Sequence, residues 1–389
     1  MKRWLLCMAL LVLLSGCVLS NLQPAETEPM QEPEPPAVQR VTFTAGGDVL
    51  IHNTVYQSLK TETGYDFTPS FAYFMDAFEA DVNIVNVESP IDAYGNNKAL
   101  ANYPTFNAPF ELSAGLRAMG ATVAVTANNH CMDNGLNGLF ASLKNLRNAG
   151  FFTMGTYESP ADYAEPKILQ VNGVNIGMLA YTDSTNGIPV PAAARDYAVR
   201  LLPVNEESAA VILADIALLK EQGADTIILS YHWGAEYKDA PSDAQRAMAA
   251  TLLEGGVDVL IGSHSHCVQP MEWIETTRGK RLVAYSLGNL FADQVGLGRL
   301  KTQAGMLLHF TITIEGDTLQ VEEVAYTPTF TYRNSAKKGP GRFLLLKSSP
   351  LSGAETRPEM FGSSNDWQQC KNALAHVQNI LGEEFEERV

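Results

Sequence analysis

DVLIGSHSHC (residues 258–267) is a short apolar run that leads into two histidines one residue apart. The run is too short for a helix and is bounded by Gly256 and Gly262, so it predicts a buried β-strand. In α/β sheets, ligand-binding side chains gather at the carboxyl ends of the strands. A His-x-His pair at that position indicates a metal site. The alternative is that His264 and His266 are ordinary loop histidines bonded to backbone, and ligands elsewhere in the chain would decide between the two.

The composition is that of a globular, acidic protein. Of the 389 residues, 46% are hydrophobic and 18% are charged, so the chain can bury a sizeable core in one large or two ordinary domains. The formal net charge is -16. An acidic body argues against nucleic-acid binding and favours bound divalent cations as local counter-charge.

The amino-terminal segment has the pattern of an export signal followed by a tether. Residues 1–16 begin with two basic residues and continue as an apolar run too short to span a bilayer, which predicts a signal peptide. LSGC (residues 14–17) resembles a bacterial lipobox, which implies cleavage before Cys17 and lipidation of its sulfur. Residues 17–40 are rich in Pro and Glu and predict a disordered tether. We therefore expect a lipoprotein outside the cytoplasmic membrane; the alternative is an uncleaved amino-terminal anchor.

Strands alternate with helices through the expected folded domain, residues 41–335, and a C-terminal extension, residues 336–389, ends in a closing helix. The expected strands are 41–45, 81–87, 121–126, 168–171, 174–181, 226–230, 258–262, 271–274, 282–285, 306–314 and 319–327. The expected helices are 136–148, 206–222, 242–254 and 367–381.

Five of the predicted strands lead into side chains that bind metal ions. These side chains are Asp48, Glu88, Asn129, His130, His232, His264 and His266. Carboxylate, imidazole and amide donors without a thiolate suit Mn, Fe or Zn. The sequence therefore predicts a site for one or two divalent ions, and Asp48 or Glu88 would have to bridge two of them.

Each residue taken alone also has an ordinary structural interpretation. Asp48 fits the cap of a turn or helix, Glu88 a solvated loop acid, and His232 a satisfied core or loop histidine. Asp133 fits a helix cap. His52 would join Asp48 only if the chain between them coils into a helical turn.

Six segments, taken in order, resemble the CapA family of poly-γ-glutamate capsule biosynthesis proteins, whose domain is related to calcineurin-like metallophosphoesterases. They are GGDVLIH (46–52), NVESPI (86–91), TANNHCMDNG (126–135), YHWGAEY (231–237), GSHSH (262–266) and YSLGNLF (285–291). The resemblance implies a four-layer α/β/β/α sandwich, metallophosphoesterase-like, with its metal centre at the strand ends.

The resemblance also implies metal-ligand roles, with Asp48 as the first metal aspartate. It implies that Asn129 and His130 form the Asn-His motif, that His232 is the lone-histidine motif, and that His264 and His266 form the terminal Gly-x-His-x-His-like motif. Two departures stand out. The histidine that phosphoesterases have two residues after the first aspartate is missing, for which His52 is a candidate substitute, and Glu88 replaces the usual second aspartate.

The resemblance implies an extracytoplasmic, membrane-anchored protein of capsule biosynthesis, with a metal-dependent hydrolase or transfer activity on a phosphoester, amide or ester. His130 and Asp48 are the candidate catalytic residues, with His130 as proton donor. Asn128, Asp133 and Asn289 are candidate substrate-binding residues. The alternative is a non-catalytic scaffold that binds the polyglutamate polymer or supports a membrane synthase. No nucleic-acid partner is expected.

The cysteines outside the amino-terminal segment are Cys131, Cys267 and Cys370, too few for a disulfide framework. Cys131 and Cys267 each adjoin a proposed ligand histidine, so they are candidates for a disulfide. The alternative is that both are small buried fillers.

Overall fold

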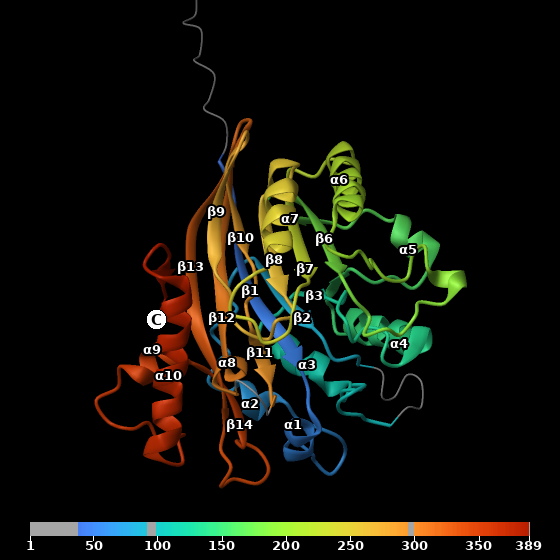
Figure 1. The fold of residues 1–389 in the computed structure, drawn as a ribbon. Coiled ribbons are helices and arrows are strands. Elements are labelled where there is room, and N and C mark those ends of the chain that lie inside the picture. Colours follow the sequence, from blue (N-terminus) through green and yellow to red (C-terminus); the bar gives the residue numbers. More distant parts are fainter. Residues whose placement is uncertain (1–37, 92–98, 295–298, 389) are drawn as a thin grey trace, which may run out of the picture. The chain divides into compact units, whose positions relative to one another are not determined.

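The computed structural model describes residues 38–91, 99–294 and 299–388, which fold around two β-sheets (Figure 1). The predicted signal peptide, the lipidation site Cys17 and most of the predicted tether lie outside the described residues. Within the described part of the chain, no helix is both long and apolar enough to cross a membrane.

The larger sheet has the strand order β14-β13-β12-β1-β2-β3-β4, and β11 and β15 pair with β1 and β13. Its strands are β1 (Gln39–Leu50), β2 (Val82–Val87), β3 (Val123–Val125), β4 (Phe152–Met154), β11 (Asn289–Ala292), β12 (Ala304–Glu315), β13 (Thr318–Arg333), β14 (Phe343–Lys347) and β15 (Glu386–Glu387). The predicted hairpin of β12 and β13 is confirmed, and its strands are antiparallel.

The smaller sheet has the order β5-β6-β7-β8-β10-β9. Its strands are β5 (Ile168–Val171), β6 (Val174–Thr182), β7 (Thr226–His232), β8 (Val259–Ser263), β9 (Met271–Thr276) and β10 (Gly279–Ala284). Every residue of β7 and β8 is buried, as expected for parallel strands covered on both faces, which explains the aliphatic runs Ile227–Leu229 and Val259–Ile261.

The helices complete the layers. They are α1 (Asn53–Ser58), α2 (Thr68–Phe71), α3 (Glu111–Ala118), α4 (Gly135–Asn148), α5 (Pro160–Ala164), α6 (Glu206–Glu221), α7 (Asp243–Glu254), α8 (Arg299–Gln303), α9 (Ser348–Ser352) and α10 (Ser364–Leu381). The four longest, α4, α6, α7 and α10, confirm the four predicted helices. Helix α7 starts at the predicted position because Ser242 and Gln245 form a reciprocal capping box.

The four-layer α/β/β/α sandwich is confirmed by the way the apolar faces pack. The inner faces of the two sheets form one core, in which Phe43 of β1 stacks on Phe310 of β12 with ring centroids 4.6 Å apart. The outer face of the larger sheet packs under α1 to α4, and that of the smaller sheet under α6 and α7. Each layer therefore buries one face of its neighbour.

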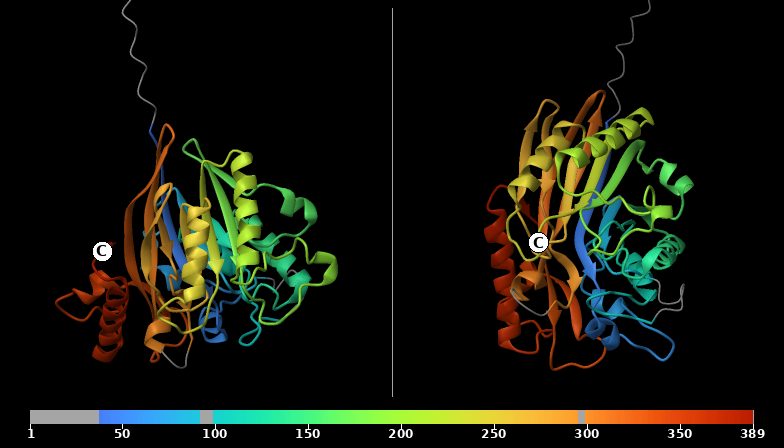
Figure 2. Two further views of the ribbon diagram at one scale, coloured as in Figure 1. Left: turned by 45° about the horizontal axis from the view of Figure 1, so that its top comes forward. Right: turned by 45° about the vertical axis from the view of Figure 1, so that its right-hand side comes forward.

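The segment after residue 335 contributes directly to this architecture. Strands β14 and β15 pair with β13, and Cys370, Ala373 and Val377 of α10 pack into the core between the sheets. In both views of Figure 2, α10, in red, lies beside the orange strands of the larger sheet.

The strand ends that carry the predicted ligands meet at one edge of the sandwich. Strands β1, β2 and β3 are parallel neighbours in one sheet, and β7 and β8 are parallel neighbours in the other. The helical turn considered between Asp48 and His52 is wrong, because β1 pairs with β2 and β11 beyond Asp48 and α1 begins only at Asn53. A register shift at Asp48 bends β1 there instead.

Candidate metal centre

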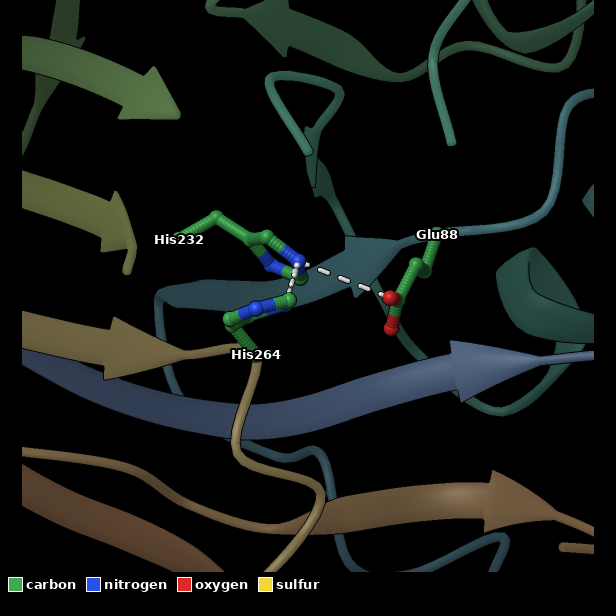
Figure 3. A group of neighbouring side chains, drawn as sticks. All are labelled: Glu88, His232 and His264. Carbon is green, nitrogen blue, oxygen red and sulfur yellow. Dashed lines mark hydrogen bonds and ion pairs between the residues drawn. The ribbon is translucent and has the colours of Figure 1, made fainter. Parts of the chain in front are cut away.

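Buried acids and histidines from four strand ends form two groups that could each hold a metal ion. One group consists of Glu88, His232 and His264, and the other of Asp48, Glu88 and His266. In each group, the potential ligand atoms lie within 4.8 Å of one another. Glu88 belongs to both groups. Figure 3 shows its carboxylate pointing towards His232, while His264 reaches His232 from the end of β8.

Glu88 has the geometry expected of a shared ligand. Its side chain is completely buried, and neither carboxylate oxygen has a hydrogen-bond partner among the described residues. Oε1 lies 3.5 Å from His232 Nε2, and Oε2 lies 3.8 Å from His266 Nδ1, so one oxygen faces each group. A buried carboxylate without hydrogen bonds is costly unless a cation neutralises it. The donors therefore fit two divalent cations with Glu88 between them.

Asp48 is held rigidly for the second group. Its Oδ1 accepts a hydrogen bond of 2.7 Å from Asn86 Nδ2, and its Oδ2 lies 3.1 Å from His266 Nδ1. Burial alone would raise the pKa of Asp48, but the hydrogen bond and charge of His266 outweigh it and hold the pKa below its usual value. The carboxylate is thus in the ionised form that binds metal ions.

His232 and His264 face each other in the first group. His232 Nε2 lies 3.0 Å from His264 Nδ1, and His232 Nδ1 lies 2.9 Å from Ser263 Oγ. Burial, with His232 close by, lowers the pKa of His264 to about 3, so its ring is neutral and has a nitrogen lone pair to offer. The contact to Ser263 orients the His232 ring from behind, as is usual for metal-binding histidines.

His266 belongs to the second group, and its ring centroid lies 6.2 Å from that of His264. Burial alone would lower its pKa, but the charges of Glu88 and Asp48 raise the pKa of His266 to about 9. Its Nδ1 also lies 3.1 Å from Asn289 Oδ1. Both histidines have positive φ angles, 93° for His264 and 58° for His266, a backbone conformation that is uncommon for residues other than glycine.

The three asparagines predicted as site residues, Asn128, Asn129 and Asn289, contact the histidines of these groups or the strand ends beside them. Asn129 Oδ1 is 3.0 Å from His232 Nε2, and Asn289 is bonded to His266. Asn128 Nδ2 donates to Val87 O over 3.0 Å and ties the ends of β2 and β3 together. Asn128 and Asn289 are buried and engaged with protein atoms, and their role in substrate binding stays a prediction.

His130 lies outside both groups, on the wall of a cavity of about 780 Å³ beside the centre. Its Nδ1 is 2.8 Å from Asp133 Oδ2, which also accepts a hydrogen bond of 2.6 Å from Phe106 N. Asp133 is therefore a positioning residue for His130, and its predicted contact with substrate stays untested. His52 lines the same cavity but belongs to neither group.

Asp133→Asn is expected to lower kcat on a hydrolysable substrate roughly 10- to 100-fold, because His130 loses the carboxylate that sets its orientation and tautomer. Metal content and KM should change little, since Asp133 is in neither group. Steady-state kinetics with elemental analysis of the same samples measures this. An unchanged kcat, or a loss of metal in parallel with activity, would argue against a positioning role.

Sequence reasoning missed Asn86, which bonds Asp48 and lies 3.2 Å from His232 Nδ1. The available signal was an amide inside the apolar strand VNIVNV, because a buried polar side chain needs partners.

The structure also decides between the two interpretations of the cysteines, a disulfide or small buried fillers, for the described residues. Cys131, Cys267 and Cys370 are buried free thiols, so the proposed disulfide is wrong and the filler interpretation fits.

Comparison with protein families gives a match over residues 42–294 to the model of the bacterial capsule synthesis protein PGA_cap. The chain belongs to this family. The match spans β1 to the residues after β11 and so includes every ligand of the two groups. The resemblance to CapA proteins inferred from the six sequence motifs is thereby confirmed.

Three curated relatives show the extent of the similarity. The PGA biosynthesis protein CapA of Bacillus subtilis (strain 168) is 30% identical over 274 residues, covering 69% of this chain and 67% of the relative. The capsule biosynthesis protein CapA of Bacillus anthracis is 28% identical, covering 70% and 64%. A "Probable polyglutamine synthesis accessory protein" of Mycobacterium tuberculosis is 28% identical, covering 60% and 62%. The chain thus spans about two thirds of the relatives that it matches.

Two solved structures are similar at a lower level. A phosphatase from Mycoplasma pneumoniae has a TM-score of 0.46 at 13% identity, over 75% of this chain and 94% of that one. The calcineurin-like phosphoesterase YfkN from Bacillus subtilis has a TM-score of 0.41 at 15% identity, over 88% and 100%.

Proposed function

We propose that this protein acts in poly-γ-glutamate capsule biosynthesis as a metal-dependent hydrolase or transferase, anchored outside the cytoplasmic membrane by a lipid on Cys17. The observation that carries the catalytic part is Glu88, a fully buried carboxylate without hydrogen bonds that lies between two groups of metal-binding side chains. The names of the Bacillus relatives support the role in capsule biosynthesis. The lipobox-like sequence at residues 14–17 supports the anchor.

The residues in and beside the centre would have different roles in the reaction. Divalent cations bound here would supply positive charge beside the reacting bond and lower the pKa of water in their coordination shell. Asp48, Glu88 and the three histidines would hold these ions. His130 lies next to them, and since its Nδ1 faces Asp133, its Nε2 is the atom that can give a proton to a leaving group.

The reaction class can be tested with the purified full chain and a chromogenic phosphodiester such as bis(p-nitrophenyl) phosphate. We expect hydrolysis that depends on added Mn²⁺ or Zn²⁺, stops with a chelator and falls at least about 100-fold in His264→Ala. Asp317→Asn, in the β12–β13 turn far from the centre in sequence, is the matched control and should keep full activity. Activity that survives both the chelator and His264→Ala would refute the catalytic proposal.

A second candidate is an accessory protein that supports a membrane polymer synthase without catalysis, which the name of the mycobacterial relative favours. The two candidates differ in what capsule production requires. The catalytic proposal expects capsule output to fall in a strain carrying His264→Ala as well as in one carrying Cys17→Ala. The accessory role expects output to need Cys17 and to survive His264→Ala.

A further inference from the structure

Three side chains that line the cavity beside the metal centre belong to neither group of metal-binding side chains. They are Tyr103, Glu236 and Tyr237, which we call the rim. Tyr103 comes from the segment before α3, and Glu236 and Tyr237 come from the loop after β7. Tyr103 is 75% exposed and Tyr237 43% exposed, which is unusual for aromatic side chains that border a cavity. Exposed aromatic rings at such a place indicate a binding surface.

The loop after β7 presents Tyr237 in a strained conformation. Tyr237 has a φ of 63°, which is rare for a bulky residue, and its backbone N–H donates to Ser265 O over 2.8 Å. Its ring centroid lies 6.0 Å from that of His266, a ligand of the second group. The backbone between His264 and His266 thus fixes Tyr237 beside the centre. A ligand on the rim would therefore lie next to the reacting bond.

The charge of the cavity wall points to one kind of ligand. No Lys or Arg is among the described residues that line the cavity, and the His266 ring, which also lines it, faces the carboxylates of Asp48 and Glu88. Two of the lining carboxylates are already paired, Asp133 with His130 and Asp293 with Arg333 at 3.0 Å. Glu236 is exposed and forms no salt bridge within the described part of the chain. The exposed Glu236 carboxylate, which is hydrogen-bonded to the side chain of Tyr237, is therefore a rim charge that no cationic side chain of the described residues neutralises.

The two tyrosines add to the attraction for a cation. Tyr103 and Tyr237 line the same cavity, and both side chains are exposed. Neutral aromatic rings attract ammonium groups over their faces. A carboxylate with two such rings is complementary to a positively charged amine.

We propose that the rim is a subsite for a protonated amino group of the substrate, adjacent to the bond that reacts. This inference rests on the proposed function, because it takes the metal centre as the place of reaction. In a γ-linked glutamate chain each residue carries a carboxylate, whereas only the amino terminus carries an ammonium group. The rim repels the former and attracts the latter. The substrate class that fits is therefore the amino-terminal end of the chain, or another amine-bearing molecule, and not the anionic interior of the polymer.

The test compares γ-glutamyl-glutamate, whose amino terminus is charged, with its N-acetylated form, in which an acetyl group removes that charge. Binding of both to the full chain, supplied with Mn²⁺, is measured by calorimetry, and metal content is measured in the same samples. We expect the free amine to bind about ten-fold more tightly than the acetylated peptide. Glu236→Gln and Tyr237→Leu should remove most of this preference. Tyr237→Phe keeps the ring and should retain it.

Several outcomes would overturn the subsite. These are equal or tighter binding of the acetylated peptide, no binding of either peptide, or an undiminished preference in Glu236→Gln. Failure of the proposed function is visible separately, as absence of bound metal from the wild-type chain. The rim residues are outside both metal groups, so Glu236→Gln should leave the metal content unchanged.

Discussion

Glu88→Gln is expected to reduce metal-dependent hydrolysis by at least about 100-fold and to weaken metal binding by a similar factor. The glutamine keeps the size of the side chain but removes the negative charge, and its amide nitrogen cannot bind a cation. Because one oxygen of Glu88 faces His232 and the other faces His266, both ion positions lose a ligand at once. The loss of activity and of metal affinity should therefore be larger than for replacement of a residue that belongs to one group only.

Kinetics and metal titration of Glu88→Gln, Asp48→Asn and Asp317→Asn measure this difference. Asp48 belongs to one group, so Asp48→Asn should impair one ion position more than the other. Asp317→Asn should behave like the wild type. If Glu88→Gln kept wild-type activity and metal affinity, Glu88 would not be a ligand and the model of a shared carboxylate would fail.

Gly262→Ala is expected to destabilise the protein by about 3 kcal/mol and to abolish metal binding. A Cβ at this position would lie 1.9 Å from Tyr285 O and 2.7 Å from Trp233 Nε1. The first of these atoms belongs to the backbone after β10 and cannot move aside easily. The end of β8 would have to shift, and His264 and His266 follow it directly. A displacement of about 1 Å is enough to disrupt a precisely placed site.

Denaturant unfolding and metal content of Gly262→Ala test this prediction. Gly353→Ala is the matched control, because the nearest atom to its Cβ would be Ser349 O at 3.7 Å, an ordinary contact. The control should remain within about 1 kcal/mol of the wild type. A Gly262→Ala variant with normal stability and normal metal content would show that β8 does not fix the two histidines.

The strand ends could be predicted from the sequence because two local signals coincide there. β7 and β8 each contain a run of aliphatic residues, Ile227–Leu229 and Val259–Ile261. β7 ends at His232, and His264 comes directly after β8. Parallel strands place their carboxyl ends at one edge, so the chain order of these motifs was enough to expect that they converge. Helices α6 and α7 were equally visible, because their apolar residues recur at helical spacing.

Other features depend on contacts between distant segments and have no local signal. The register shift at Asp48 arises where β1 changes from pairing with β12 to pairing with β11. Glu88 follows a strand of the larger sheet, whereas His232 and His266 come from the smaller sheet and the loop that follows its strand β8. Their meeting depends on how the two sheets pack. Tyr103 lies far from Tyr237 in sequence and gives no periodic pattern. The missing histidine after Asp48 was visible, but its consequence for the chemistry was not.

Elemental analysis of the full chain tests the shared metal centre most directly. The protein would be loaded with Mn²⁺ or Zn²⁺, freed of weakly bound ions by gel filtration, and compared with Glu88→Gln. The account predicts two equivalents of metal per chain, with both reduced together when Glu88 is replaced. No bound metal in the wild type, or a content that Glu88→Gln leaves unchanged, would contradict it.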